Sequence, residues 1–284
     1  MIFKEWMILL IIVLLVRPLT VIVKNWKAKK QSQNDSDNRE VSDEQTTQRE
    51  IVYEPLNDSE VIDGELNDSE VIDGELNDHE YVDLGLPSGL KWATCNVGAS
   101  APEEYGDYYA WGETAPKDDY RRLTYKWATA TYDAEHEGWN LETLTKYNTR
   151  SSYGTVDNKT VLEPEDDAAA VNWGGQWRMP TDAEWTELRE NCEWTWTDDY
   201  NGTGVAGRIV TSKINGNSIF LPAAGYRRNV NLSYAGSDGY YWSSSLYADE
   251  PSVAWCVFFE SDGVGRDVSG RYYGHSVRPV LYMP

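Results

Sequence analysis

The segment from Trp173 to Trp185 constrains the fold more than any other part of the chain, and it reads WGGQWRMPTDAEW. Thr181 is a good N-cap residue, and Glu184 follows three positions later as the partner of a capping box. Pro180 precedes the cap and stops any helix upstream. The segment therefore predicts a helix that begins directly after Thr181, behind a glycine-kinked and tryptophan-rich approach.

Short apolar runs separated by Gly, Pro, Asn and Asp surround this helix from about residue 78 onward. The run Asn215-Gly216-Asn217 lies between two of them, and Asn-Gly between apolar runs predicts a β-hairpin. A second short helix is expected over residues 165–171. Strands are expected over residues 81–84, 91–94, 208–214, 218–221, 240–243, 254–259 and 275–281. Two short helices, many short strands and long loops predict an α+β domain.

The aromatic content of the chain is dominated by 13 Trp and 19 Tyr, against only 4 Phe. Trp and Tyr bury an apolar ring while a polar tip stays hydrogen-bonded or wet. Two interpretations follow. The rings either build the core of a loop-rich domain or belong to a binding surface.

The net charge of −22 is unevenly distributed along the chain. Residues 1–30 carry six Lys or Arg and one Glu, whereas residues 31–85 carry two Arg and 18 Asp or Glu. Neutralising phosphates requires a basic patch, so the sequence predicts that the chain does not bind nucleic acid. Residues 31–77 are too poor in apolar side chains to repay the entropy of ordering, and we interpret them as an acidic disordered linker.

This linker contains a ten-residue repeat. The sequence LNDSEVIDGE begins at Leu56 and again at Leu66, and an altered third copy begins at Leu76. Stacked solenoid repeats need about 20 residues or more each, so a solenoid is not expected. The copies resemble duplications of the first strand of the domain, and a flexible stalk is the favoured interpretation.

An apolar segment at the N-terminus runs from Trp6 to Val23, interrupted at Arg17-Pro18. A bilayer span needs about 20 residues, so residues 6–23 just suffice for a membrane helix, and residues 1–30 are interpreted as a membrane anchor. A cleaved signal peptide is the alternative, although no small-x-small cleavage site follows. The lysines from Lys24 to Lys30 follow the apolar run, and by the positive-inside rule they would place the rest of the chain in the cytoplasm.

The cysteines and histidines form no recognisable metal-binding or catalytic motif. Cys95, Cys192 and Cys256 allow at most one disulfide, and no C-x-x-C pair is present. No Gly-x-Ser-x-Gly elbow is present either. The sequence therefore predicts no catalytic residue, no metal and no cofactor.

Several further blocks accompany the tryptophan-rich segment in a fixed order. They are YVDLGLPSGLKWA from Tyr81, NVGA from Asn96, EYGDYYAWGET from Glu104, DDAA from Asp166, LPAAGYR from Leu221, YWSS from Tyr241 and SVRPV from Ser276. Together these blocks resemble the bacterial major paralogous domain family first named from Fibrobacter succinogenes. The family has the C-type-lectin-like fold and is distantly related to the formylglycine-generating sulfatase-modifying enzymes.

The resemblance implies an exported domain on the bacterial cell envelope, against the charge bias after residue 23. It also suggests two activities to consider. The sulfatase-modifying enzymes hold copper with two late cysteines, whereas this chain has only Cys256 in the comparable strand. Calcium-binding lectins use a Glu-Pro-Asn motif, whereas this chain has Glu250-Pro251-Ser252 and lacks the remaining oxygen ligands. Neither activity is therefore expected.

The C-terminal segment shows a second kind of pattern. Framework-like residues such as Trp255, Val257 and Phe259 alternate there with Cys, Phe, Gly, Asp, Val, Ser and Tyr, all of which can be coded by changing only the adenines of an asparagine codon. No Asn occurs after Asn231. The pattern resembles the variable proteins of diversity-generating retroelements, which display such positions on a C-type-lectin-like scaffold. An ordinary loop of mixed composition is the alternative.

We therefore divide the chain into an anchor (1–30), a linker (31–77) and a C-type-lectin-like domain (78–284). The predicted function is a membrane-tethered, non-enzymatic domain that presents C-terminal loops to an unidentified protein or glycan. The alternatives are a sulfatase-modifying-type oxidase and a structural surface protein without a specific ligand. The expected ligand-binding residues are Tyr247, Cys256, Phe258, Gly263, Gly265, Asp267, Val268, Ser269 and Tyr273.

Overall fold

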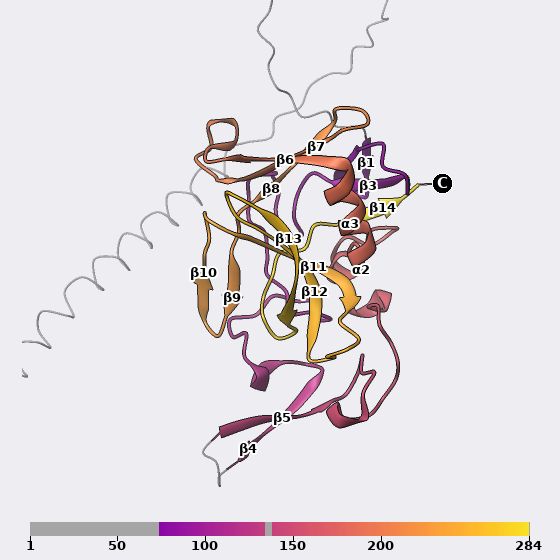
Figure 1. Ribbon diagram of the computed structural model, residues 1–284, viewed down its shortest axis with the longest axis vertical. Helices are drawn as coiled ribbons and strands as arrows, with labels where there is room; N and C mark the ends of the chain where they lie inside the picture. The colour runs from indigo at the N-terminus through magenta and orange to yellow at the C-terminus, as the bar shows by residue number, and fades with distance from the viewer. Residues whose placement is uncertain (1–73, 134–137, 284) are drawn as a thin grey trace, which may run out of the picture. The chain divides into compact units, whose positions relative to one another are not determined.

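Fourteen short strands and two short helices make up the part of the chain that the structure describes, which is residues 74–133 and 138–283 of a computed structural model (Figure 1). All strand pairs within the sheets are antiparallel, so the predicted α+β class is confirmed. The predicted membrane segment and the repeats up to residue 73 lie outside the described residues. Within the described residues, no helix is long and apolar enough to cross a membrane.

The first sheet brings the two ends of the domain together. Its strands, in spatial order, are β1 (Gly74–Leu76), β2 (His79–Asp83), β3 (Leu90–Ala93) and β14 (Val280–Tyr282). β1 and β2 form a hairpin whose two turn residues, Asn77 and Asp78, have φ angles of 53° and 62°, as a type I′ turn requires. Residues 74–76 were expected at the end of the disordered linker and instead form the edge strand of this sheet.

The second sheet contains the hairpin that Asn-Gly predicted. It consists of β6 (Cys192–Thr197), β7 (Gly207–Ser212) and β8 (Ser218–Pro222), in that order. β7 and β8 pair antiparallel around residues 213–217, which confirms the predicted hairpin. Two separate hairpins join β4 (Ala128–Asp133) to β5 (Gly138–Leu144), and β9 (Tyr226–Arg228) to β10 (Asn231–Ser233).

The third sheet carries the C-terminal segment. It consists of β11 (Gly239–Leu246), β12 (Val253–Phe259) and β13 (Val264–Gly270), with β13 at its edge. The sequence predicted β11 and β12 but treated residues 264–270 as a loop. Their Gly, Asp and Ser content disfavours a strand locally, and pairing along the whole length of β12 overrides it. The strand expected over residues 275–281 is shorter than predicted and begins at Val280.

Both predicted helices are present, and each has a capped N-terminus. Helix α3 (Asp182–Asn191) begins after Thr181, whose hydroxyl accepts from the Glu184 amide at 3.3 Å while the Glu184 carboxylate accepts from the Thr181 amide at 2.7 Å. Helix α2 (Ala168–Trp173) begins after Asp167, later than expected, because residues 164–166 form a 3-10 turn. The other 3-10 turns are Arg122–Thr124, Ser151–Tyr153 and Tyr200–Gly202.

Buried tryptophans connect these elements through their indole N–H groups. Trp111, Trp185 and Trp242 are at most 1 % exposed. Trp111 donates to the Ser243 carbonyl at 2.8 Å, Trp185 to that of Trp242 at 3.1 Å, and Trp242 to that of Tyr109 at 2.8 Å. Each ring therefore packs in the core and holds a distant backbone segment, which favours the core interpretation for these tryptophans.

Candidate functional site

The register of the third sheet places the alternating C-terminal residues on one face. Cys256 lies opposite Trp242 on β11 and Asp267 on β13, and Phe258 lies opposite Tyr240 and Gly265. Directly opposed residues share a face of an antiparallel sheet. The other face, with Val257 and Phe259, packs in a buried cluster with Trp185 and Leu188 of α3.

A cavity of about 220 Å³ opens on the first face, beside β13. Four of the residues that line it, Asp267, Val268, Ser269 and Tyr273, belong to the predicted ligand-binding set. The others are Tyr226, Tyr240, Gly270 and His275. The structure thus brings four predicted residues together with partners from β9, β11 and the segment after β13.

Backbone bridges position the partners that come from distant parts of the chain. Arg227 and Gly274 exchange two hydrogen bonds, of 2.7 and 2.9 Å, which places Tyr226 beside the residues that follow β13. Ser276 donates to the Tyr240 carbonyl at 3.1 Å and accepts from the Trp242 amide at 3.1 Å. These contacts hold His275 against β11.

Three tyrosine rings form the walls of the cavity. The rings of Tyr226 and Tyr240 meet at 4.9 Å in an edge-to-face arrangement, and those of Tyr226 and Tyr273 stack at 5.8 Å. Phe258 packs against Tyr240 at 5.0 Å, and the exposed Tyr234 stacks on Tyr226 at 5.9 Å. The aromatic surface therefore extends beyond the cavity itself.

His275 is buried beside the cavity and stacks on Trp242 with ring centroids 4.0 Å apart. Burial lowers the pKa of His275 to about 3, so its imidazole is neutral at ordinary pH. Its Nε2 lies 3.1 Å from the Ser269 hydroxyl, whereas Nδ1 has no hydrogen-bond partner among the described residues. The imidazole therefore holds Ser269 in place and retains one unused polar atom.

Exposed carboxylates lie at the cavity and at the turn between β12 and β13. Asp267 is exposed at the cavity, and one of its carboxylate oxygens accepts from the Val268 amide at 2.8 Å. Glu260 and Asp262 are exposed at the turn between β12 and β13. Partial loss of solvation, together with the negative charges of Asp262 and Asp238, raises the pKa of Glu260. In the described part of the chain, none of these four carboxylates forms an ion pair with Lys or Arg.

Two buried arginines hold the backbone at the two ends of β13. Before the strand, the Arg208 guanidinium donates to the carbonyls of Glu260 and Gly263 at 2.6 and 3.2 Å. After it, Arg271 is 1 % exposed and donates to the Pro251 carbonyl at 2.9 Å and to the Tyr125 hydroxyl at 2.8 Å. The acceptors on residues 260 and 263 are backbone atoms, so this anchoring does not depend on which side chains β13 displays.

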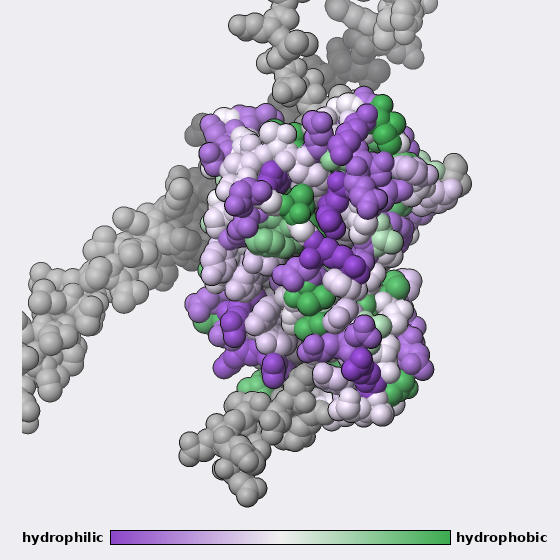
Figure 2. Space-filling view, viewed as in Figure 1, coloured by the Kyte–Doolittle hydropathy of each residue, from purple (hydrophilic) through white to green (hydrophobic). Residues whose placement is uncertain are grey.

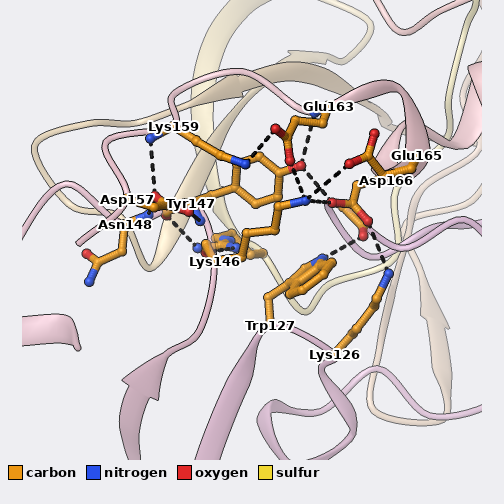
Figure 3. A network of polar contacts seen from close by, with 12 residues as sticks. Lys126, Trp127, Lys146, Tyr147, Asn148, Asp157, Lys159, Glu163, Glu165 and Asp166 are labelled. Atoms are coloured by element: carbon orange, nitrogen blue, oxygen red, sulfur yellow. Dashed lines mark hydrogen bonds and ion pairs between the residues drawn. The ribbon is translucent and has the colours of Figure 1, made fainter. Parts of the chain in front are cut away.

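Arg271 also bonds to the backbone of Lys146 and Tyr147, whose side chains belong to the polar network in Figure 3. It donates to the carbonyls of Tyr147 and Lys146 at 3.1 and 3.0 Å. The Lys146 ammonium lies 2.5 Å from the buried Asp166 carboxylate and 2.5 Å from that of Glu163, and the Tyr147 hydroxyl donates to Asp166 at 2.7 Å. Because cations already surround Asp166, we interpret this network as structural and not as a metal site.

Gly263 and Gly265 leave open space on the displayed face. A Cβ built on either residue would have no heavy atom within 4 Å, so larger side chains fit at both positions. The surface drawn in colour in Figure 2 is mostly hydrophilic to neutral, with hydrophobic residues in small separate groups. That view of the described residues shows no large apolar patch of the kind that marks an obligate protein interface.

Two of the predicted ligand-binding residues, Cys256 and Tyr247, do not line the cavity. Cys256 is on the predicted face but only 1 % exposed, because its thiol packs in a core cluster with Trp242 and Val277. An external ligand does not reach it, so we do not retain it as a contact residue. Tyr247 packs against Trp255 with ring centroids 4.9 Å apart and does not line the cavity.

Sequence reasoning missed Tyr226, Tyr240 and His275, which complete the cavity. Nothing local marks them as cavity residues, because their proximity is created by the long-range bridges Arg227–Gly274 and Tyr241–Ser276. The conspicuous Tyr content was the only available signal. Among the described residues, no group of His, Cys, Asp and Glu has the arrangement of a metal site.

Comparison with known proteins adds one match over this region. Residues 203–280 match a family described as a domain of unknown function, DUF8237. The matched residues include the β7–β8 hairpin, all of β11–β13 and every residue that lines the cavity. No curated protein and no solved structure matches the chain.

Proposed function

We propose that this chain is a membrane-tethered, non-enzymatic binding protein whose C-terminal sheet contacts a protein or glycan partner. One observation carries the proposal. Arg208 and Arg271 fix both ends of β13, largely through backbone carbonyls, while the side chains between them project from an edge strand beside a cavity. A rigid framework that tolerates varied side chains is what a display surface requires.

The finer fold assignment belongs to the same proposal. The ordered sequence blocks, the pairing of the two chain ends through β3 and β14, and the three-stranded C-terminal sheet support a C-type-lectin-like domain of the major paralogous family. The apolar segment 6–23 would tether it to the bacterial envelope, with the domain extracytoplasmic. Protease treatment of intact cells tests the topology, because a domain cut only after lysis would contradict it.

The chemistry of Cys256 supports a non-enzymatic role. Burial, together with the negative charges of Asp267 and Asp182, raises the pKa of the Cys256 thiol. Copper and other soft metals bind the thiolate, which this environment disfavours. The proposal therefore expects that Cys256→Ser leaves partner binding unchanged.

A protein and glycan array probed with the full chain tests the binding function. A matched pair of variants separates the face from the rest of the surface. Asp267→Ala and Ser269→Ala together alter the face, whereas Lys213→Ala and Glu193→Ala together alter exposed positions of the second sheet that do not line the cavity. We expect the first pair to abolish a specific signal and the second to preserve it. No specific signal on a folded chain, or equal loss with both pairs, would contradict the proposal.

The adenine-diversification hypothesis makes a separate prediction at the level of the gene. The codons for Phe258, Gly263, Gly265, Asp267, Val268, Ser269 and Tyr273 should all end in a pyrimidine. Sequencing the gene decides this point. Purine-ending codons at these positions would reject diversification without affecting the proposed binding face.

A further inference from the structure

The walls of the cavity beside β13 have the chemistry of a cation site. Tyr226, Tyr240 and Tyr273 present aromatic rings around one small space, and aromatic faces carry partial negative charge. A cation within about 6 Å of such a ring is attracted to it, and the attraction grows as the cation is desolvated. The neutral His275 adds a polar atom to the same wall without adding positive charge.

The charges around the cavity also favour a cation. Asp267 lines the cavity, and Asp238 lies directly before β11, two residues from Tyr240. Burial and the negative charges of Asp238 and Asp267 raise the pKa of Tyr240. Arg208 is the nearby buried cation, and its guanidinium is already hydrogen-bonded to the Trp194, Glu260 and Gly263 carbonyls.

The size of the cavity limits what it can accept. Pockets for drug-sized ligands are about 300–1,000 Å³, and this one is about 220 Å³. It accommodates one small head group, which leaves the exposed residues of β13 to contact the rest of a partner. A branched glycan would fit only through a single residue.

From these observations we infer that the cavity binds the cationic head of a lysine or arginine side chain on a protein partner. This inference rests on the proposed binding function and selects protein over glycan as the partner. The head group would sit among the three tyrosine rings with Asp267 as its counter-ion. Hydrogen bonds to a charged group are the stronger class, so Asp267 supplies specificity for a cation over a neutral side chain of similar shape.

Arg228 provides an internal check on this assignment. Its guanidinium carbon lies 5.3 Å from the centre of the Tyr273 ring, and the side chain is exposed. One wall of the cavity thus already attracts a cation of the chain itself. Because Arg228 repels an incoming cation, we expect that removing it strengthens binding of a basic side chain.

The test uses the full chain and four capped pentapeptides of sequence Gly-Ser-X-Ser-Gly, with X as lysine, arginine, norleucine or glutamate. Isothermal titration gives each affinity at low salt. We expect lysine and arginine peptides to bind and the norleucine and glutamate peptides to bind at least about tenfold more weakly. Equal affinity for norleucine, or tighter binding of glutamate, would overturn the inference.

Variants of the cavity refine the test. Asp267→Asn should weaken binding of the lysine peptide about tenfold, and Arg228→Ala should strengthen it. Tyr240→Phe keeps the aromatic ring and should preserve binding, whereas Tyr240→Leu should lose it. Circular dichroism checks that each variant is folded, and Asp262→Asn provides a second charge variant on an exposed turn. Weaker binding in Arg228→Ala would show that the cavity favours an anion and would overturn the inference.

The two proposals fail in different ways. If a partner found on the array still binds Asp267→Asn normally and tolerates acetylation of its lysines and blocking of its arginines, the cation assignment is wrong while the binding face stands. A glycan partner would likewise overturn the cation assignment and leave the binding face in place. If the full chain binds nothing specifically on the array, the proposed function itself fails.

Discussion

Individual glycines on the third sheet differ sharply in the space around them. A Cβ at Gly265 on β13 would meet nothing within 4 Å, whereas one at Gly239 on β11 would lie 2.1 Å from the Phe259 ring. Neither residue needs the left-handed backbone conformation that favours glycine. The difference therefore reflects packing, and it separates a displayed position from a core position within the same sheet.

This contrast predicts opposite responses to substitution. Gly265→Tyr should change the free energy of unfolding by less than about 0.5 kcal/mol, because the ring projects into solvent. Gly239→Ala should cost about 1–3 kcal/mol, because the added methyl overpacks against Phe259. Urea unfolding of the full chain measures both. A comparable loss at the two positions would contradict the displayed-face assignment.

Asp166 shows how the network in Figure 3 depends on charge. Burial alone would raise the pKa of its carboxyl, but hydrogen bonds from Lys146, Tyr147 and Lys126 outweigh burial and hold the pKa below its usual value. A group with a depressed pKa contributes stability above its unfolded pKa of about 3.9 and loses that contribution as the pH falls through the folded pKa.

Asp166→Asn is therefore expected to destabilise the protein by about 1.5–3 kcal/mol at pH 7. The difference from the native protein should begin to shrink as the pH falls to about 4, where the unfolded chain takes up the proton, and should be lost as the pH falls further through the lower folded-state pKa. Urea unfolding at pH 7 and pH 3.5 measures both quantities. A difference that is the same at the two pH values would show that shape, and not charge, accounts for the role of Asp166.

Helices and strands that are formed by local interactions could be predicted from the sequence, whereas those formed by long-range interactions could not. The start of α3 is set by Thr181 and Glu184, three residues apart, and the β7–β8 hairpin by its own turn, so both were predictable. β13 forms because it pairs with β12, because the distant Arg208 holds the turn before it, and because Arg271 directly after it bonds to residues far away in the sequence; no local propensity indicates these contacts. The same holds for the candidate site. The alternation that places Asp267 and Ser269 on one face is local, whereas the position of Tyr226 depends on a bridge to a distant segment.

Arg271 is expected to dominate the stability of the edge strand. Arg271→Met leaves the buried carbonyls of Tyr147, Pro251 and Lys146 without a donor and should cost at least about 2 kcal/mol. Amide hydrogen exchange should rise across β13 before it rises in β11. Arg266→Met is the matched control within the strand. It removes an exposed ion pair with Asp182 and should cost less than about 1 kcal/mol.

For the molecule as a whole, the N-terminal boundary of the folded domain lies earlier than the sequence suggested. β1 occupies residues 74–76, and the buried Trp177 donates its indole N–H to the Leu76 carbonyl at 3.0 Å. His79 stacks on Trp173 at 3.7 Å directly after the turn. The tryptophan-rich approach to α3 thus packs against the first hairpin.

A chain that begins at residue 78 should therefore be less stable than one that begins at residue 66. Losing β1 removes its pairing with β2 and the hydrogen bond of Trp177, and each net hydrogen bond contributes about 1 kcal/mol. Thermal unfolding of the two truncated chains measures the difference. Equal melting temperatures would place the boundary at residue 78, as the sequence predicted.

Because Trp242 stacks on His275, its fluorescence is expected to respond to changes in the cavity. Trp242 is fully buried, and its indole lies directly behind the imidazole that lines the cavity. An occupant that shifts His275 changes the surroundings of one identifiable indole among 13. The fluorescence emission of the native protein should therefore change when a ligand binds, and that of Trp242→Phe should not. Occupancy of the cavity could then be measured without a label.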